Sequence, residues 1–160
     1  MKHVLLAAAV VSSMAFAAAP PERPNQPVFR SGPWFVVRST RADIVVCTGF
    51  YRANRHVQLT KDMLVIQTPE EVRDVSFAFD DHAAGAPRPL SAGEKDLKAV
   101  AFTGDDFARL AKSHTVRIDA TNAQGVVRHD LELNGLPGAL ENINAGCPVQ
   151  ALPKRGRHRS

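Results

Sequence analysis

The sequence predicts a mainly β protein, an antiparallel β-sandwich or strongly curved sheet with two short helices and one disulfide. Apolar residues recur with a period of two in several short runs, turn-forming residues separate the runs, and none has the spacing of a β-α-β unit. The 160 residues, 44% hydrophobic and 22% charged, have an average globular composition and the length of one domain. No internal repeat and no second long apolar run occurs, which excludes repeat proteins and proteins with several membrane spans.

The N-terminal residues have the pattern of a signal peptide. Lys2 and His3 precede an uncharged apolar stretch that is about 24 Å long as a helix, which is short for a retained membrane anchor. Small residues at Ala15 and Ala17 predict cleavage after Ala17. We therefore expect a signal peptide at 1–17, a proline-rich arm at 18–27, a single β-rich domain at 28–150 and a basic flexible tail at 151–160. The mature protein is expected to be periplasmic or secreted, with no transmembrane anchor.

The expected export indicates that the two cysteines form a disulfide. An oxidising compartment favours disulfides, and Cys47–Cys147 is the one intramolecular pair available. Such a bond closes a loop of about 100 residues, worth about 4 to 5 kcal/mol in the chain-entropy model. The alternative is a pair of buried free thiols. A catalytic thiol is disfavoured because neither cysteine lies in a C-x-x-C or cysteine-histidine signature.

The strands are predicted from alternation and from the turns between them. The first follows the Gly32-Pro33 turn and contains the only tryptophan, Trp34. In the run at 75–79, three apolar residues alternate with polar or small ones, and the Gly- and Pro-rich stretch 80–89 after it is expected to be a loop. The complete set of expected strands is 34–38, 44–47, 57–59, 63–67, 75–79, 97–103, 114–120 and 126–133.

Two short helices are predicted among these strands. At 107–112, Asp105 and Asp106 precede apolar residues at helical spacing, which is typical of a capped helix start. At 136–143, Leu136, Leu140 and Ile143 share one helical face. This second helix leads directly to Cys147, so the predicted disulfide would pin it to the second strand.

Several of these features together resemble a known group of bacterial proteins. They are Trp34 opening an early strand, a short acidic-capped helix, the hairpin that ends in the sequence LELNGL at 131–136, then Ala139-Leu140 and a late cysteine. In this order of elements, over roughly residues 32–147, the chain resembles the invasion-associated locus B family of small exported proteins. The resemblance implies an envelope protein linked to host-cell entry, with a β-sandwich fold and no established enzymatic residues. Where such proteins often have a further cysteine after the first tryptophan, this chain has Arg38-Ser39-Thr40.

The net charge of +4 is concentrated at one end of the chain. Lys154, Arg155, Arg157 and Arg159 all lie in the last seven residues, and without them and Lys2 the remaining chain is close to neutral. Clustered cations favour weak contact with a polyanion such as lipopolysaccharide, anionic lipid or nucleic acid, and the alternative is a solvated end. Specific nucleic-acid binding is disfavoured because no aromatic residues are interleaved with the cations.

The polar clusters of the sequence carry no catalytic or metal-binding signature. Asp80-Asp81-His82 combines carboxylates with an imidazole, but its position between a strand and a loop is typical of an exposed turn. His129-Asp130 with Asp119 across a hairpin is a second candidate, although alternation places adjacent residues on opposite faces. We therefore predict no catalytic residue, metal or cofactor, and favour a protein that is not an enzyme. The alternative is a small periplasmic hydrolase or metal-dependent enzyme that uses His82, His114 or His129.

A basic and aromatic cluster predicts a binding surface. Tyr51, Arg52 and Arg55 lie between Cys47 and the strand at 57–59, where a hairpin tip is expected, and an exposed aromatic ring flanked by arginines is common in protein recognition. The alternative is a strand edge protected by charge. The function predicted from these observations is an exported, non-enzymatic binding protein, an envelope-associated or virulence- or immunity-type module whose partner is another envelope or secreted protein.

Overall fold

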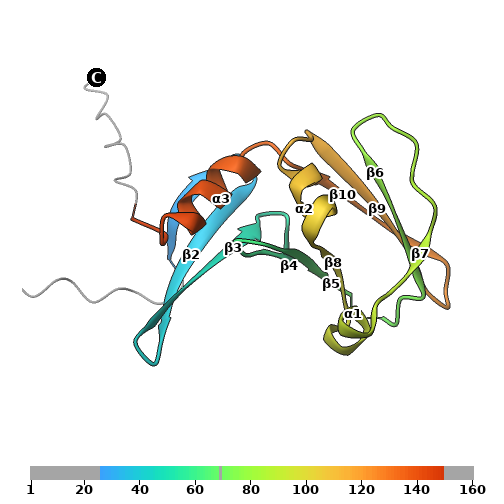
Figure 1. The fold of residues 1–160 in the computed structure, drawn as a ribbon, viewed down its shortest axis with the longest axis horizontal. Coiled ribbons are helices and arrows are strands. Elements are labelled where there is room, and N and C mark those ends of the chain that lie inside the picture. The colour runs from blue at the N-terminus through green and yellow to red at the C-terminus, as the bar shows by residue number, and fades with distance from the viewer. Residues whose placement is uncertain (1–25, 69, 150–160) are drawn as a thin grey trace, which may run out of the picture.

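The computed structural model describes residues 26–68 and 70–149 and contains two antiparallel sheets (Figure 1). The predicted signal peptide, nearly all of the predicted arm and the predicted basic tail lie outside the described residues. The six-stranded sheet has the order β1-β2-β3-β4-β5-β8, with β1 (Pro27–Ser31), β2 (Trp34–Arg41), β3 (Ile44–Tyr51), β4 (Asn54–Leu59), β5 (Leu64–Gln67) and β8 (Ala99–Phe102). The four-stranded sheet has the order β10-β9-β6-β7, with β6 (Asp74–Phe79), β7 (Arg88–Pro89), β9 (Thr115–Thr121) and β10 (Val126–Glu132).

In the described part of the chain, three short helices accompany the sheets: α1 (Ala92–Leu97), α2 (Gly104–Leu110) and α3 (Leu136–Asn144). The predicted mainly β, antiparallel sandwich with a disulfide is confirmed, and α2 and α3 lie where the two predicted helices were expected. None of the helices within the described residues combines the length and apolarity needed to cross a membrane.

The core is formed by the facing sides of the two sheets. Alternation operates as predicted in β9, where Val116, Ile118 and Ala120 are buried. Phe102 of β8 is fully buried and meets the rings of Phe77 and Phe79 from β6, with centroids 4.3 and 6.3 Å away. Burial of an aromatic or branched apolar side chain contributes about 1.5 to 3 kcal/mol, so this contact joins the sheets chiefly through the hydrophobic effect.

The structure differs from the sequence-based prediction around residues 92–97. We expected a strand from residue 97, but Leu97 ends helix α1 and is 61% exposed, and the strand begins two residues later. The helix begins with a capping box, in which the Ser91 side chain accepts from the Glu94 amide and the Glu94 side chain accepts from the Ser91 amide. The Ser-x-x-Glu spacing was visible in the sequence and was the signal for this third helix. Two more elements were also missed, the edge strand β1 and the short β7 within the expected loop.

The end of β10 is held between two aromatic residues of the larger sheet. The Trp34 indole N–H donates to the Glu132 carbonyl at 3.1 Å, and the Tyr51 hydroxyl accepts from the Glu132 amide at 3.2 Å. The two rings meet edge to face, with centroids 5.2 Å apart. Both backbone groups of one residue are therefore bonded to side chains of the other sheet, which sets where β10 ends and where the chain turns toward α3.

Helix α3 begins at a close approach of two backbones. Gly135 has a φ of 87°, and a Cβ there would lie 2.3 Å from the Ser31 carbonyl oxygen. Gly32, in the β1–β2 turn, has a φ of 55° and is similarly crowded by Asn134. Any other residue at position 135 meets both a steric clash and an unfavourable left-handed conformation.

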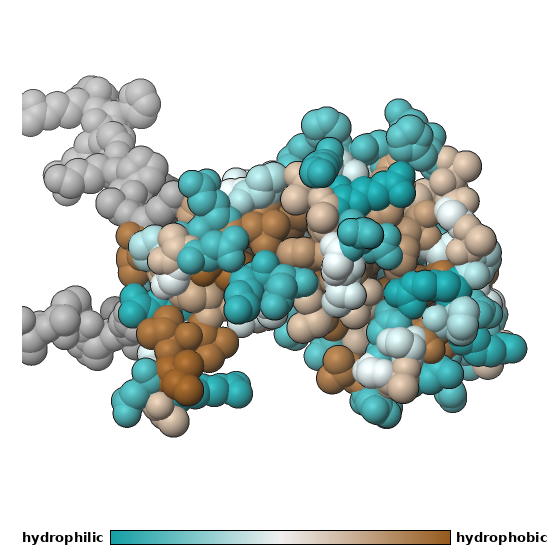
Figure 2. All heavy atoms as spheres, in the orientation of Figure 1, coloured by the Kyte–Doolittle hydropathy of each residue, from teal (hydrophilic) through white to brown (hydrophobic). Residues whose placement is uncertain are grey.

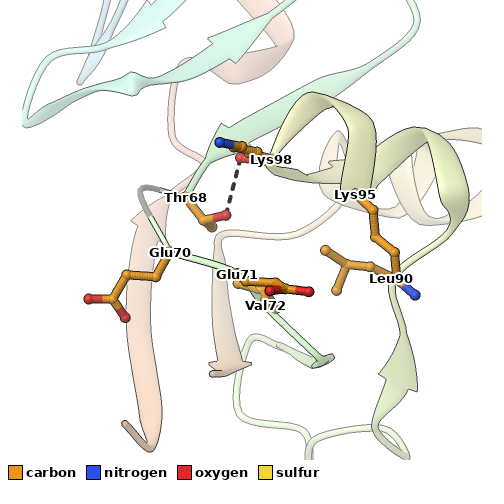
Figure 3. Close-up of a pocket in the computed structure, with 7 residues that line it drawn as sticks. All are labelled: Thr68, Glu70, Glu71, Val72, Leu90, Lys95 and Lys98. Atoms are coloured by element: carbon orange, nitrogen blue, oxygen red, sulfur yellow. Dashed lines mark hydrogen bonds between the residues drawn. The ribbon is translucent and has the colours of Figure 1, made fainter. Parts of the chain in front are cut away.

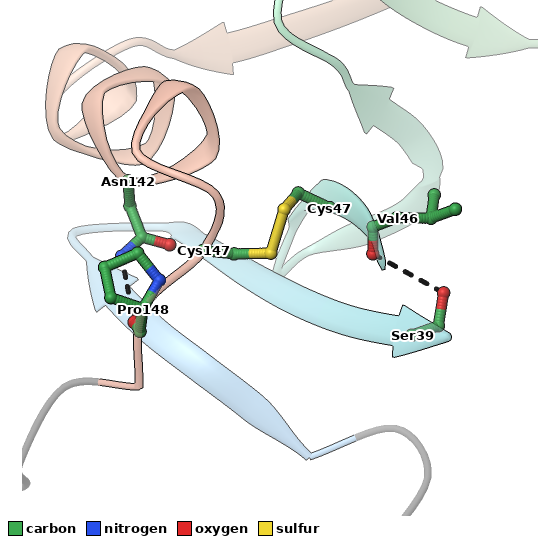
Figure 4. Close-up of a disulfide and its surroundings, with 6 residues drawn as sticks. All are labelled: Ser39, Val46, Cys47, Asn142, Cys147 and Pro148. Atoms are coloured by element: carbon green, nitrogen blue, oxygen red, sulfur yellow. Dashed lines mark hydrogen bonds between the residues drawn. A yellow bond between two sulfur atoms is a disulfide. The ribbon is translucent and has the colours of Figure 1, made fainter. Parts of the chain in front are cut away.

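The disulfide joins Cys147, three residues after the end of α3, to Cys47 in the middle of β3 (Figure 4). Cys47 and Cys147 have Cα atoms 5.9 Å apart and are separated by 100 residues. Cys147 is fully buried, and its amide donates to the Asn142 carbonyl at 2.8 Å, which closes the C-terminal end of the helix. The predicted pairing is therefore present, and the last described segment is held on the larger sheet.

Replacing both cysteines by alanine should lower the free energy of unfolding by about 4 kcal/mol, because the unfolded chain regains the entropy of a loop of 100 residues. Denaturant unfolding of the double variant and of the wild type, each with and without reductant, measures this. The reductant should destabilise only the wild type. Equal stability of the oxidised wild type and the variant would contradict the prediction.

Gly135→Ala should destabilise the protein by at least about 2 kcal/mol, since the left-handed conformation and the contact with Ser31 both oppose a Cβ. Gly93→Ala is the matched control, because Gly93 lies in α1, has an ordinary helical φ and has nothing within 4 Å of an added Cβ. That control should be neutral or stabilising by up to about 1 kcal/mol. Thermal unfolding of the two variants checks the difference, and similar melting temperatures would refute it.

Candidate binding surface

The predicted hairpin tip is the β3–β4 turn, which is tied to the turn between β1 and β2. The Arg52 amide donates to the Pro33 carbonyl at 2.8 Å, and an Arg52 guanidinium N–H donates to the Gly32 carbonyl at 3.4 Å. The Asn54 side chain accepts from the His56 amide at 2.9 Å, which shapes the return into β4. These bonds hold the backbone while the Arg52 and Arg55 side chains remain exposed.

Tyr51 does not have the exposed position that the sequence suggested. It is only 8% exposed, because it lies on the inward face of β3 opposite Trp34 and bonds to Glu132. The expectation that its ring is exposed for recognition is therefore wrong, and its aromatic ring belongs to the core. The assignment of Arg52 and Arg55 to a binding surface stays a prediction.

A different pair of rings lies beside the arginines. Phe35 and Phe50 face each other across β2 and β3 on the outward side of the sheet, stacked with centroids 5.5 Å apart. The Arg55 guanidinium carbon lies 5.6 Å from the centroid of the Phe35 ring, within the range of a cation–π contact. Phe35 is only 7% exposed and lies beneath Arg55, whereas Phe50 is partly exposed. We call Arg52, Arg55 and Phe50, together with the Phe35 ring beneath Arg55, the hairpin surface. Period-two alternation in Trp34-Phe35 and Phe50-Tyr51 was the signal that one ring of each pair faces outward.

The candidate cluster at 80–82 is a structured turn. Asp80 has a φ of 52°, and its carboxylate accepts from the amides of Thr115 at 3.0 Å and His114 at 2.7 Å. These two backbone bonds, with smaller contributions from the charges of His114 and His82, hold the pKa of Asp80 below its usual range. The carboxylate thus fastens the end of β6 to the start of β9.

The second candidate catalytic cluster, His129-Asp130 with Asp119, is divided between the two faces of the β9–β10 hairpin. His129 pairs with Ile118 across β9 and β10, whereas Asp119 pairs with Arg128. The Asp119 carboxylate accepts from the Arg128 guanidinium at 2.7 and 3.2 Å, and this bond lowers the pKa of Asp119. Asp119 therefore binds an arginine and lies away from His129. Among residues 26–68 and 70–149, no group of three or more histidine, cysteine, aspartate or glutamate side chains is placed to hold a metal ion.

The most deeply buried carboxylate is Glu94, which is 6% exposed and bonds to the outer edge of β8. It forms a bidentate ion pair with Arg88, both N–O distances being 2.9 Å, and accepts from the Ala101 amide at 2.9 Å. Arg88 in turn donates to the Ala101 carbonyl at 3.4 Å. Burial alone would raise the pKa of Glu94, but the bonds from Arg88, Ala101 and Ser91 outweigh it and lower the pKa from 4.5 to about 2. The ion pair thus occupies strand-edge groups that would otherwise be open to another strand.

A small cavity lies between helix α1 and the segment that leads into β6 (Figure 3). Its volume is about 240 Å³, below the range of about 300 to 1,000 Å³ that is usual for small-molecule sites. Carboxylates and ammonium groups line it in equal number, and the Thr68 hydroxyl donates to the Lys98 carbonyl at 3.1 Å across its rim. The lining residues are Thr68, Glu70, Glu71, Val72, Leu90, Lys95 and Lys98.

The fold and surface described so far define the class of this protein as a disulfide-bonded antiparallel β-sandwich with an arginine- and phenylalanine-bearing hairpin. No protein-family model and no curated protein matches the chain. Among solved structures, the crystal structure of invasion associated protein B from Bartonella henselae is similar to it. The two are 17% identical, the match covers 73% of this chain and 94% of that chain, and the TM-score is 0.49. The resemblance predicted from the sequence is thus met by a weak structural one.

Glu94→Gln should make the protein less stable at neutral pH by about 2 kcal/mol, an amount reduced from the full pKa shift because Arg88 is partly exposed. The wild-type advantage should be complete well above pH 4.5 and should be lost progressively as the pH falls from 4.5 through about 2, where the carboxylate of the folded protein also becomes protonated. Thermal unfolding between pH 7 and pH 2 measures it. Asp96→Asn, an exposed change in the same helix, is the control; a stability difference between wild type and Glu94→Gln that does not vary with pH would refute the prediction.

Proposed function

We propose that this chain is an exported, non-enzymatic binding protein of the bacterial envelope, and that the hairpin surface contacts its protein partner. The observation that carries the proposal is the Arg55 guanidinium over the Phe35 ring, which stacks on Phe50, next to the exposed Arg52. Arginine and aromatic side chains are the residue types that contribute most to protein–protein affinity.

The framework under this surface supports the proposal. The β3–β4 turn is held by one backbone bond to Pro33 and by the Asn54 side chain, so Arg52 and Arg55 extend from a fixed backbone. A surface whose backbone is already ordered loses less entropy when it binds. Two exposed arginines beside the partly exposed Phe50 ring match a partner that presents carboxylates next to a small apolar contact.

Export is the second part of the proposal. The signal-peptide pattern at 1–17 and the Cys47–Cys147 disulfide are both typical of proteins in an oxidising compartment. We infer that the mature protein acts in the periplasm or outside the cell, where an envelope or secreted protein is its partner.

Arg52→Ala with Arg55→Ala should weaken partner capture at least about tenfold, because both charged contacts and the cation–π pair are lost. The test immobilises residues 18–160 and measures retention of a defined protein from an envelope extract by wild type and variant. Both side chains are exposed, so the melting temperature should stay within about 2 °C of the wild type. Tyr51 is unsuitable for this test since its ring is in the core.

Lys61→Ala with Lys112→Ala is the matched control, because it removes the same charge from exposed positions elsewhere. It should bind the retained protein as the wild type does, and so should a chain that lacks residues 154–160. Equal capture by the Arg52/Arg55 variant and the wild type would remove the hairpin surface from consideration. Capture that needs only the C-terminal cations and disappears with salt would indicate polyanion contact instead.

A further inference from the structure

Strands β2 and β3 continue past their neighbours as a two-stranded arm. Strand β1 pairs with β2 only as far as Val37, and β4 pairs with β3 only from Gly49 onward. Beyond these points, Arg38–Arg41 and Ile44–Cys47 pair with each other and with no further strand among residues 26–68 and 70–149. We call these residues and the turn between them the arm, and Figure 1 shows it projecting at the lower left, away from the four-stranded sheet.

The arm carries three consecutive exposed apolar residues. Ile44, Val45 and Val46 are 67%, 42% and 37% exposed, and Figure 2 shows a brown patch over the arm at the lower left. By alternation, Ile44 and Val46 lie on one face of the ribbon and Val45 on the other. A protein that binds an added strand along its edge has pockets for alternate side chains, whereas the boundary between lipid headgroups and acyl chains can receive apolar side chains from both faces of a ribbon. Apolar exposure on both faces therefore favours a lipid surface.

Cations are concentrated at the same end of the molecule. Arg38 and Arg41 lie on the β2 side of the arm. The disulfide holds Cys147 at the base of the arm, with its Cα 5.9 Å from that of Cys47, and Lys154 follows only seven residues later. Seven residues span at most about 25 Å, so the basic C-terminal residues begin within reach of a surface that the arm touches.

We propose that the arm and the C-terminal cations together bind the surface of a bilayer rich in anionic phospholipid. An apolar segment and a basic cluster are each weak alone, and membrane attachment commonly needs two such signals. We expect the arm to insert only to the depth of the lipid headgroups. In the described part of the chain its outer edges have no neighbouring strand, so their backbone groups need water, and Asp43 lies in its turn. The arm lies at the opposite end of β3 from the hairpin surface, so membrane contact leaves that surface accessible.

The test is sedimentation of residues 18–160 with vesicles of phosphatidylcholine alone or with about one third phosphatidylglycerol at constant salt. We expect the anionic vesicles to bind at least about tenfold more tightly. Ile44→Ser with Val46→Ser should lower binding to the anionic vesicles about tenfold, and removal of residues 154–160 should remove most of the dependence on phosphatidylglycerol. These positions are exposed or terminal, and circular dichroism with thermal unfolding confirms that each variant is folded.

Val126→Ser with Val127→Ser is the matched control, since these exposed valines lie in β10 of the other sheet. This control and the Arg52/Arg55 variant should bind vesicles as the wild type does, which separates the result from that of partner capture. Wild-type binding by the Ile44/Val46 variant would overturn the proposal and leave electrostatic adsorption by the C-terminal cations. A concentration-dependent dimer that only the Ile44/Val46 variant abolishes, with no vesicle binding by the wild type, would also overturn it and assign the arm to a second copy.

Discussion

The position of the two sheets relative to each other depends on the backbone of Glu132, at the end of β10. Its carbonyl accepts from the Trp34 indole and its amide donates to the Tyr51 hydroxyl, so the end of β10 is fixed to the larger sheet by two directional bonds. Hydrophobic contact between the sheets, such as that of Phe102 with Phe77, has no direction of its own and sets no register. The bond to Glu132 also holds the Tyr51 ring in the core, so Tyr51 is not available on the outer surface of the sheet.

Strand β3 links the parts of the molecule that carry the proposed functions. At one end its residues close the core and lead into the hairpin surface, and at the other they form the arm. Between these ends, Cys47 receives the disulfide that holds the segment after α3. A strand fixed at its centre and at one end can extend several residues without support from neighbours, which explains how an exposed apolar ribbon coexists with a well-packed core.

Three acidic side chains stabilise the two sheets through hydrogen bonds and ion pairs. Asp80 binds the start of β9, Asp119 binds Arg128, and Glu94 with Arg88 bonds to the edge of β8. Each carboxylate is held ionised by its partners, as the lowered pKa values show. Carboxylates in this state serve poorly as proton-transfer groups near neutral pH, so the role of these three side chains in the described structure is to hold strands and turns together.

The sequence by itself determined the fold class, most of the strands, the helices α2 and α3 and the pairing of Cys47 with Cys147. Alternation and helical spacing are local properties, and two cysteines allow one pairing. Tertiary structure alone decided the face on which each aromatic residue lies. In Phe50-Tyr51 both neighbours are aromatic, so alternation shows that they face opposite ways but not which face β10 covers. Only the sheet arrangement could show that the arm extends beyond β1 and β4, because the exposure of Ile44 depends on how far the two neighbouring strands run alongside β2 and β3, and alternation within β3 does not show this.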